Sequence, residues 1–251
     1  MKTAIITGAS AGLGTDFALQ LHDVFPEIDH VVLIARRMDR LEAVAGKMTG
    51  VQVECLPLDL CEEESFSELE SFLNEKKLDV ALLINCAGCG DMGNFGEIDT
   101  AKQMRIVDLN VRALTAATNV VIPFMKQGAH ILNISSIASF CANPRMTTYS
   151  ASKAYVSSFT LGISEELKEK GITATAICPG PMRTEFLELA SIHDSFAFNH
   201  LPYCDSRKVA LQGLKAAKAG KVFVTPRAFF KFYRVLAKIL PSTWMVKLTK
   251  T

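Results

Sequence analysis

A tyrosine and a lysine four residues apart are the pair of side chains whose spacing most directly indicates chemistry. They occur in the segment Tyr149-Ser150-Ala151-Ser152-Lys153, and in a helix this spacing places both on one face. A tyrosine with a reference pKa of about 10 exchanges protons poorly at neutral pH. A cation one turn away would favour the phenolate and lower that pKa. The pair therefore predicts acid–base catalysis.

Two other polar residues could act beside this pair. Ser136 stands at the end of a predicted strand, thirteen residues before the tyrosine, where its hydroxyl could hydrogen-bond a substrate carbonyl. Taken alone, Ser136 is equally typical of a turn or a helix cap. Asn110 lies between Leu109 and Val111, and alone it is more typical of a buried amide bonded to backbone.

A glycine-rich loop follows the first predicted strand and leads directly into a helix. It reads Thr7-Gly8-Ala9-Ser10-Ala11-Gly12-Leu13-Gly14. Glycines allow a tight turn and a close approach of ligand to backbone, and a helix N-terminus offers free N–H groups to a pyrophosphate. In this position the loop predicts a dinucleotide-binding site.

The end of the second predicted strand indicates which dinucleotide to expect. An NAD site places a carboxylate there to bind the ribose diol, but this chain has Arg36 and Arg37, and its nearest acid is Asp39. Two guanidinium groups suit a 2′-phosphate, although a pair of solvated surface arginines is the simpler alternative. We expect NADP(H) as the cofactor.

The elements that must position these residues alternate regularly along the chain. Short apolar runs predict strands at 3–7, 30–35, 52–57, 80–85, 130–135 and 172–178, and later at 221–225. Helical patterns occupy 16–25, 40–47, 62–76, 101–125 and 150–170, and later 205–219 and 227–240. This alternation predicts an α/β fold with one doubly wound parallel sheet and helices on both faces. We expect a single domain over residues 1–251.

These motifs together resemble the short-chain dehydrogenase/reductase family in its compact, single-domain form. The resemblance covers about residues 1–185 and rests on motifs that occur in the family's order: the glycine loop, Asp59-Leu60, Asn85-x-Ala87-Gly88, Asn110, Asn133-x-Ser135-Ser136, Tyr149-x-x-x-Lys153 and Pro179-Gly180. One departure is Cys86, where the family often has a second asparagine. Epimerase-type members usually have a different glycine spacing and longer chains, so the resemblance favours redox chemistry.

The resemblance implies a role for each matching residue. Tyr149 would be the general acid in reduction and Ser136 would polarise the carbonyl. Lys153 would hold the nicotinamide ribose and lower the tyrosine pKa, and Asn110 would anchor a water that leads protons to it. Asp59 would meet the adenine amine, Ala87 and Gly88 the adenosine ribose, and Thr184 the nicotinamide carboxamide. Further cofactor contacts are implied for Gly8, Ser10, Gly12, Leu13, Gly14, Leu60, Asn85, Pro179 and Gly180.

Composition agrees with a globular enzyme and excludes some partners. Of 251 residues, 49% are hydrophobic and 21% charged, and the formal net charge is +1, which argues against nucleic acid as the main partner. Seven scattered cysteines, Cys86 and Cys89 among them, are expected to be structural, with no redox or metal role. Because residues 1–7 predict a strand and no apolar run could span a membrane, we expect no signal peptide and a cytoplasmic protein.

Two C-terminal segments are expected to differ from the core. Residues 181–204 are apolar and predict a lid over the substrate, with an ordinary packing element as the alternative. The extension 226–251 is basic and apolar: eleven Lys and Arg follow Asp205, with no Asp or Glu after it. Its helix at 227–240 could pack against the body or a second subunit, lie on anionic lipid as a peripheral membrane contact, or bind an anionic carrier or CoA-like substrate.

The sequence thus predicts an NADPH-dependent carbonyl reductase acting on an apolar ketone or aldehyde, with the reverse alcohol oxidation available. A homodimer or homotetramer built on the two long helices at 101–125 and 150–170 is expected. The alternative is a non-catalytic NADPH-binding regulator, or a lipid-surface protein that uses the basic helix. The set Asn110, Ser136, Tyr149 and Lys153 favours the enzyme, because a regulator does not need it.

Overall fold

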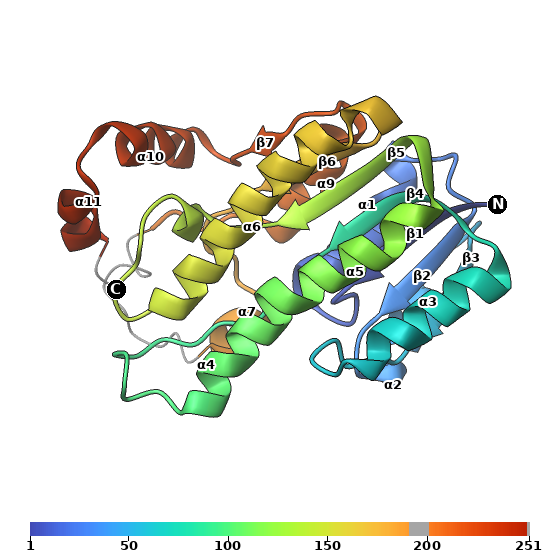
Figure 1. Cartoon of the computed structure of the whole chain (residues 1–251), viewed down its shortest axis with the longest axis horizontal. Helices are drawn as coiled ribbons and strands as arrows, with labels where there is room; N and C mark the ends of the chain where they lie inside the picture. The colour runs from blue at the N-terminus through green and yellow to red at the C-terminus, as the bar shows by residue number, and fades with distance from the viewer. Residues whose placement is uncertain (191–200, 250–251) are drawn as a thin grey trace.

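Seven parallel strands form one sheet in the order β3-β2-β1-β4-β5-β6-β7, as Figure 1 shows. The computed structural model describes residues 1–190 and 201–249. The strands are β1 (Lys2–Thr7), β2 (His30–Ile34), β3 (Gln52–Leu56), β4 (Asp79–Asn85), β5 (Met125–Ile134), β6 (Thr173–Ile177) and β7 (Phe223–Val224). The predicted doubly wound parallel sheet is confirmed.

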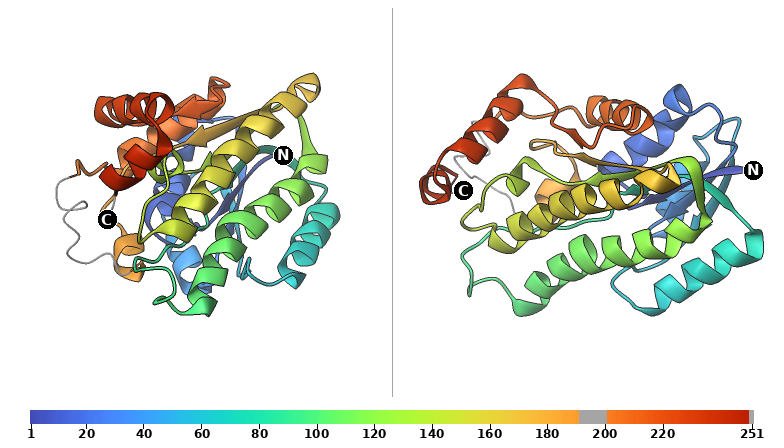
Figure 2. Two further views of the ribbon diagram at one scale, coloured as in Figure 1. Left: turned by 60° about the vertical axis from the view of Figure 1, so that its left-hand side comes forward. Right: turned by 45° about the horizontal axis from the view of Figure 1, so that its top comes forward.

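Helices cover both faces of this sheet (Figures 1 and 2). One face is packed by α1 (Gly12–Val24), α2 (Met38–Ala45) and α9 (Ser206–Lys218). The other is packed by α3 (Glu64–Lys76), α5 (Ala113–Val121) and α6 (Thr147–Glu166), with α4 (Thr100–Val107) preceding α5. The remaining helices are α7 (Glu185–Leu189), α10 (Ala228–Ile239) and α11 (Ser242–Leu248).

The central strands are buried on both faces, which explains their unbroken apolar sequences. All five residues of β2 are buried, and so are the last five of β1. A strand covered by helices on both sides has no solvent face on which polar residues would alternate. This feature made the strands visible in the sequence to within about two residues in most cases, as with β6 at Thr173–Ile177.

The predicted helix at 101–125 is wrong in two respects. A π-helical turn, Asp108–Arg112, separates α4 from α5, and a 3₁₀ turn at Ile122–Phe124 ends the helix. Strand β5 then begins at Met125, five residues earlier than predicted, with Gly128 at a φ of 89°. A glycine adopts this left-handed conformation without strain, so the chain can enter the sheet early. The hydrophobic pattern gave no sign of either irregularity.

The C-terminal elements follow the prediction only partly. Asp205 caps α9 by accepting a hydrogen bond from the Lys208 N–H at 3.1 Å, and β7 is two residues long instead of five. Helix α10 ends at Ile239, before Pro241, as expected, but α11 was not predicted. Of the predicted lid at 181–204, the structure shows α7, while residues 191–200 lie outside the described part of the chain.

A row of buried amides and hydroxyls ties the middle of the sheet to the helices behind it. Asn85 Nδ2 donates to Thr118 Oγ1 and to Asn133 Oδ1, both at 2.9 Å. Asn133 Nδ2 in turn donates to Thr160 Oγ1 at 3.0 Å. Buried polar groups must find such partners, so this row fixes α5 and α6 against the ends of β4 and β5.

Candidate active site

The glycine loop is built for a close approach of backbone segments. Gly8 and Gly12 have φ values of 68° and 53°, which disfavour residues with a Cβ. A Cβ on Gly14 would lie 2.1 Å from the Gly8 carbonyl oxygen, and one on Gly8 would lie 2.8 Å from Ala87 Cα. Helix α1 begins at Gly12 and directs its free N–H groups at the space beside this loop. The cradle fits a diphosphate.

The segment after β4 is tied to the same loop. The Thr7 hydroxyl accepts hydrogen bonds from the backbone N–H groups of Cys86 and Ala87, both at 3.1 Å. Asn85, just before them, is buried in the amide row and does not line the cleft. Its implied part in cofactor binding is therefore positional: it holds the strand from which Ala87 and Gly88 emerge.

Arginines surround the end of β2, and each has a carboxylate partner. Arg36 Nη1 lies 3.8 Å from Asp59 Oδ2, and Arg105 Nη2 lies 3.6 Å from the same oxygen. Partial burial of Asp59 raises its pKa, but the backbone hydrogen bond from Cys61 and the two arginines outweigh this, so the pKa is lowered. Arg105 was not predicted, because a lone arginine in a helical pattern carries no sequence signal.

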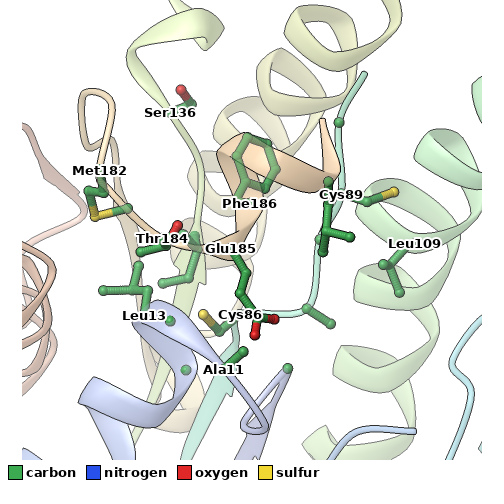
Figure 3. Close-up of a pocket in the computed structure, with 18 of the residues that line it drawn as sticks. Ala11, Leu13, Cys86, Cys89, Leu109, Ser136, Met182, Thr184, Glu185 and Phe186 are labelled. Atoms are coloured by element: carbon green, nitrogen blue, oxygen red, sulfur yellow. The ribbon is translucent and has the colours of Figure 1, made fainter. Parts of the chain in front are cut away.

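Arg37 is paired with a residue from the far side of the cleft. Its Nη2 donates to Glu185 Oε2 at 3.3 Å, and Arg40 contacts the other carboxylate oxygen. The hydrogen bond from Arg40 and, to a smaller extent, that from Arg37 lower the pKa of Glu185. Its carboxylate therefore stays ionised. Figure 3 shows Glu185 extending from α7 toward Cys86 and the glycine loop, while Phe186 points away from that loop. The sequence reading missed Glu185.

The acid–base pair lies on the first turns of α6, beside Ser136. Burial raises the pKa of Tyr149 to about 12, and a hydrogen bond with the Ser136 side chain opposes this rise. Lys153 Nζ donates to the Ile134 carbonyl oxygen at 2.9 Å and lies 5.8 Å from the Tyr149 ring centroid. Burial lowers the pKa of Lys153 to about 8.

That Lys153 lowers the tyrosine pKa stays a prediction, and in this structure the net pKa of Tyr149 is raised. Burial is the largest cause of the rise, the hydrogen bond with Ser136 opposes it, and a smaller contribution from Cys89 adds to it. Spacing brings the two side chains to one face, but burial in low dielectric disfavours the charged form of each. The result is a neutral phenol, which is a proton donor throughout the neutral range.

Asn110 occupies the π-helical turn and connects two parts of the site. Its Oδ1 accepts from the Cys89 N–H, and its Nδ2 donates to the Cys89 carbonyl and to Ser152 Oγ, all at 2.9 Å. A π-helical turn contains one more residue than an α-helical turn, so the side chains around it point in different directions. Here the Asn110 side chain points toward α6. A Cβ on Gly88 would lie 3.0 Å from Asn110 Oδ1 and 3.4 Å from Lys153 Nζ.

One cleft of about 350 Å³ joins these parts. Every predicted site residue lines it except Asn85 and Asn110, which are buried behind its wall. Cofactor-side lining comes from Gly8, Ser10, Gly12, Leu13, Gly14, Arg36, Arg37, Asp59, Leu60, Ala87 and Gly88, and the chemical end from Ser136, Tyr149, Lys153, Pro179, Gly180 and Thr184.

Apolar side chains, most of them from the predicted lid at 181–204, also line the cleft. The Phe186 ring lies 5.5 Å from that of Tyr149, and a Cβ on Gly90 would come within 2.9 Å of Phe186 and 3.1 Å of Tyr149. Further apolar lining comes from Ile137, Met146, Met182, Leu187, Leu189 and Leu201. Five of these residues, at 182, 186, 187, 189 and 201, lie inside the predicted lid, whereas Ile137 and Met146 carried no sequence signal.

The two cysteines spaced as a redox pair line the cleft and are partly buried. Burial raises the pKa of Cys86 to about 12 and that of Cys89 to about 11. The thiolate, not the thiol, is the nucleophile in disulfide exchange, so neither residue is activated.

Fold and cleft together define an α/β protein of the Rossmann class, with a glycine-rich cradle at one end of the cleft and the partly buried Tyr149 phenol at the other. A family profile described as short chain dehydrogenase matches residues 2–195. The chain belongs to this family and is an oxidoreductase, and the family uses nicotinamide cofactors.

Known proteins similar to this chain agree with that assignment. An uncharacterized oxidoreductase of Staphylococcus saprophyticus is 34% identical over 188 residues, covering 73% of this chain and 79% of the relative. A short-chain dehydrogenase from Sphingobium yanoikuyae in complex with NADPH is 27% identical, with a TM-score of 0.80 over 96% of this chain and 97% of that one. A bulky-bulky ketone specific alcohol dehydrogenase from Comamonas testosteroni is 27% identical, with a TM-score of 0.75 over 95% and 91%.

Proposed function

We propose that this protein is an NADP(H)-dependent oxidoreductase that interconverts a carbonyl compound and an alcohol, with Tyr149 as the acid or base. The observation on which this rests is the partly buried Tyr149 phenol, hydrogen-bonded to the Ser136 side chain in the wall of the cleft. A bound nicotinamide would supply the hydride at this end. In reduction, Tyr149 donates its proton to the carbonyl oxygen while Ser136 holds that oxygen by a hydrogen bond. The Lys153 ammonium is placed to bind the ribose hydroxyls.

The preference for NADP(H) is supported by the charge at the end of β2. Arg36, Arg37 and Arg40 stand there, and the first two line the cleft. A 2′-phosphate carries more charge than the Glu185 carboxylate, so it would compete effectively for Arg37. The NADPH complex of the Sphingobium dehydrogenase, at 27% identity, is consistent with this choice.

An apolar substrate is supported by the lining of the tyrosine end. Phe186, Met146 and Leu187 offer apolar contacts there, and Ser136 and Tyr149 are the polar groups that would orient a carbonyl. Pockets of this kind use a few placed polar groups for orientation and apolar walls for affinity. The ketone specificity of the Comamonas enzyme agrees with this substrate class.

A homo-oligomer built on the helices of one face remains part of the proposal. Met104 and Val107 on α4, and Tyr155 and Leu161 on α6, are exposed apolar side chains. Apolar residues at such positions are typical of subunit interfaces, where they would be covered by a second copy.

The mechanism is tested by NADPH consumption against a panel of apolar ketones and aldehydes. Tyr149→Phe should lower kcat about 10²- to 10⁴-fold, the range for loss of a general acid, and should leave NADPH binding intact. Tyr155→Phe is the matched control, because it removes the same hydroxyl from the same helix at an exposed site outside the cleft, where that hydroxyl is hydrogen-bonded to Thr115. Equal rates for wild type and Tyr149→Phe would refute the mechanism.

Cofactor preference is tested separately by binding. Replacing both Arg36 and Arg37 with Ala should weaken NADPH binding about 10- to 100-fold, the loss expected for charge-assisted hydrogen bonds, and should change NADH binding little. Arg207→Ala is a suitable control, since Arg207 is exposed and lies 3.8 Å from Asp16. Equal loss for both cofactors would contradict the preference for NADP(H).

A further inference from the structure

Helix α10 presents an apolar face to solvent, and its orientation is fixed by contacts on the opposite face. Phe230 is fully buried, and a Cβ on Gly180 would lie 2.1 Å from its ring. The Arg234 guanidinium lies 4.4 Å from the Phe223 ring centroid. These contacts anchor the inner side of α10 along β7 and the Pro179-Gly180 turn, so the helix cannot roll its outer side inward.

The outer side of α10 is more apolar than a surface helix requires. Its four large hydrophobic side chains are between 52% and 73% exposed: Phe229, Phe232, Val235 and Ile239. At 3.6 residues per turn they fall within an arc of about 120°. Single exposed apolar residues are ordinary, but a contiguous group of this size marks a surface that binds something.

Helix α11 adds two more exposed apolar residues at the same end of the molecule (Figure 2). Trp244 and Leu248 are 62% and 75% exposed, whereas Met245 on the inner side is buried. The helix is held by its last turn: Thr249 Oγ1 donates to the Ala142 carbonyl oxygen at 3.0 Å. With α10, it forms what we call the C-terminal face, comprising Phe229, Phe232, Val235, Ile239, Trp244 and Leu248.

Unpaired cations border this face. Lys221, Lys231 and Lys238, together with Arg234, line a groove of about 430 Å³ between β7 and α10. Within the described residues, 1–190 and 201–249, the three lysines have no carboxylate partner. By contrast, Lys218 in the preceding helix lies 3.2 Å from Glu27. The absence of Asp and Glu after Asp205 leaves the positive charge of this border uncompensated locally.

We propose that the C-terminal face docks on an anionic lipid surface, with Phe232 and Ile239 entering the headgroup–acyl boundary and Lys231 and Lys238 meeting lipid phosphates. Basic residues beside an apolar arc that contains two Phe, with a Trp on the adjoining helix α11, are the pattern of an interfacial helix. A helix with this apolar arc lies in the plane of the membrane. No helix in the described part of the chain is long and apolar enough to cross one.

Charge decides between this partner and a second copy of the chain. A symmetric contact through the C-terminal face would bring two lysine borders together, and residues 206–251 contain no carboxylate to pair with them. Like charges facing each other oppose association. An anionic membrane carries the opposite charge across its whole surface. It can therefore pair with the lysines and bury the apolar residues at the same time.

The test is cosedimentation of the full-length protein with vesicles. Wild type should bind vesicles of phosphatidylcholine with phosphatidylglycerol at least tenfold more tightly than pure phosphatidylcholine. Raising the salt from about 0.1 M to about 1 M, which shortens the Debye length from about 10 Å to about 3 Å, should weaken that binding. No binding to the anionic vesicles, or equal binding to both, would overturn the proposal.

Two double variants assign the binding to this face. Phe232→Gln with Ile239→Gln, and Lys231→Glu with Lys238→Glu, should each lose at least tenfold in affinity for anionic vesicles. Their matched controls are Phe95→Gln, at a side chain 75% exposed, and Lys47→Glu with Lys170→Glu, at exposed lysines elsewhere.

The variants must remain folded for this comparison, and NADPH binding equal to wild type provides that check, since none of these residues lines the cofactor cleft. Unchanged vesicle binding in both test variants would overturn the proposal. So would a wild-type oligomer that dissociates in the Phe232→Gln, Ile239→Gln variant, because the C-terminal face would then be a contact between copies.

Discussion

The lowered pKa of Lys153 predicts that NADPH binding weakens as the pH rises above about 8. The shift arises because burial disfavours the ammonium. A lysine with a lowered pKa loses its proton earlier on titration to alkali, and the charged form is the one placed to bind the ribose hydroxyls. We therefore expect affinity to be highest below pH 8 and to fall above it.

The magnitude follows from the pKa of about 8. About one tenth of the lysine is charged one pH unit above this value and about one hundredth two units above it, so the Kd for NADPH should rise up to about tenfold per unit, or 1.4 kcal/mol. Other groups in the cleft do not titrate in this range: burial raises the pKa of Tyr149 to about 12 and that of Cys89 to about 11. The second pKa of a phosphate monoester, about 6, lies below it.

The assay is direct titration of the protein with NADPH, followed by the fluorescence of the dihydronicotinamide, between pH 7 and pH 10. It needs no knowledge of the substrate. Lys153→Met is the control, and its weaker binding should show no break near pH 8. A Kd for wild type that is constant across this range, or an identical rise in Lys153→Met, would refute the reasoning.

Two further predictions concern residues around the cleft. Thr160→Val leaves the buried Asn133 Nδ2 without its acceptor. It should lower the free energy of unfolding, measured by urea denaturation, by about 1–3 kcal/mol. An unchanged midpoint would show that Asn133 finds another partner. Glu185→Gln removes the carboxylate that pairs with Arg37. It should tighten NADPH binding by up to about fivefold, the contribution of an exposed ion pair, with NADH binding as the internal reference. Equal changes for both cofactors would count against a 2′-phosphate contact.

The sheet could be predicted from the sequence because strands that are buried on both faces consist of continuous apolar residues. The positions of the cleft residues could be predicted because the carboxyl ends of parallel strands and the glycine loop meet at one edge of the sheet. The sequence could therefore predict that Ser136, which follows β5, and Gly88, which follows β4, line the same cleft.

The misses have physical causes. The raised pKa of Tyr149 follows first from burial in the folded cleft, which residue spacing does not record. Glu185 reaches Arg37 across 148 residues of chain, a contact that only the folded cleft creates. Helix α11 has seven residues, too few to display a helical period.

The π-helical turn makes the length of the α4–α5 helix part of the active site. On one side of the turn, Arg105 lies 3.6 Å from Asp59; on the other, Thr118 accepts a hydrogen bond from Asn85 at 2.9 Å. Deleting one residue from Asp108–Arg112 would restore an unbroken α-helix and rotate its two halves relative to each other by about 100°. Both contacts could not then be kept, so even deletion of Val111, which does not line the cleft, would disconnect the cofactor site from the sheet behind it.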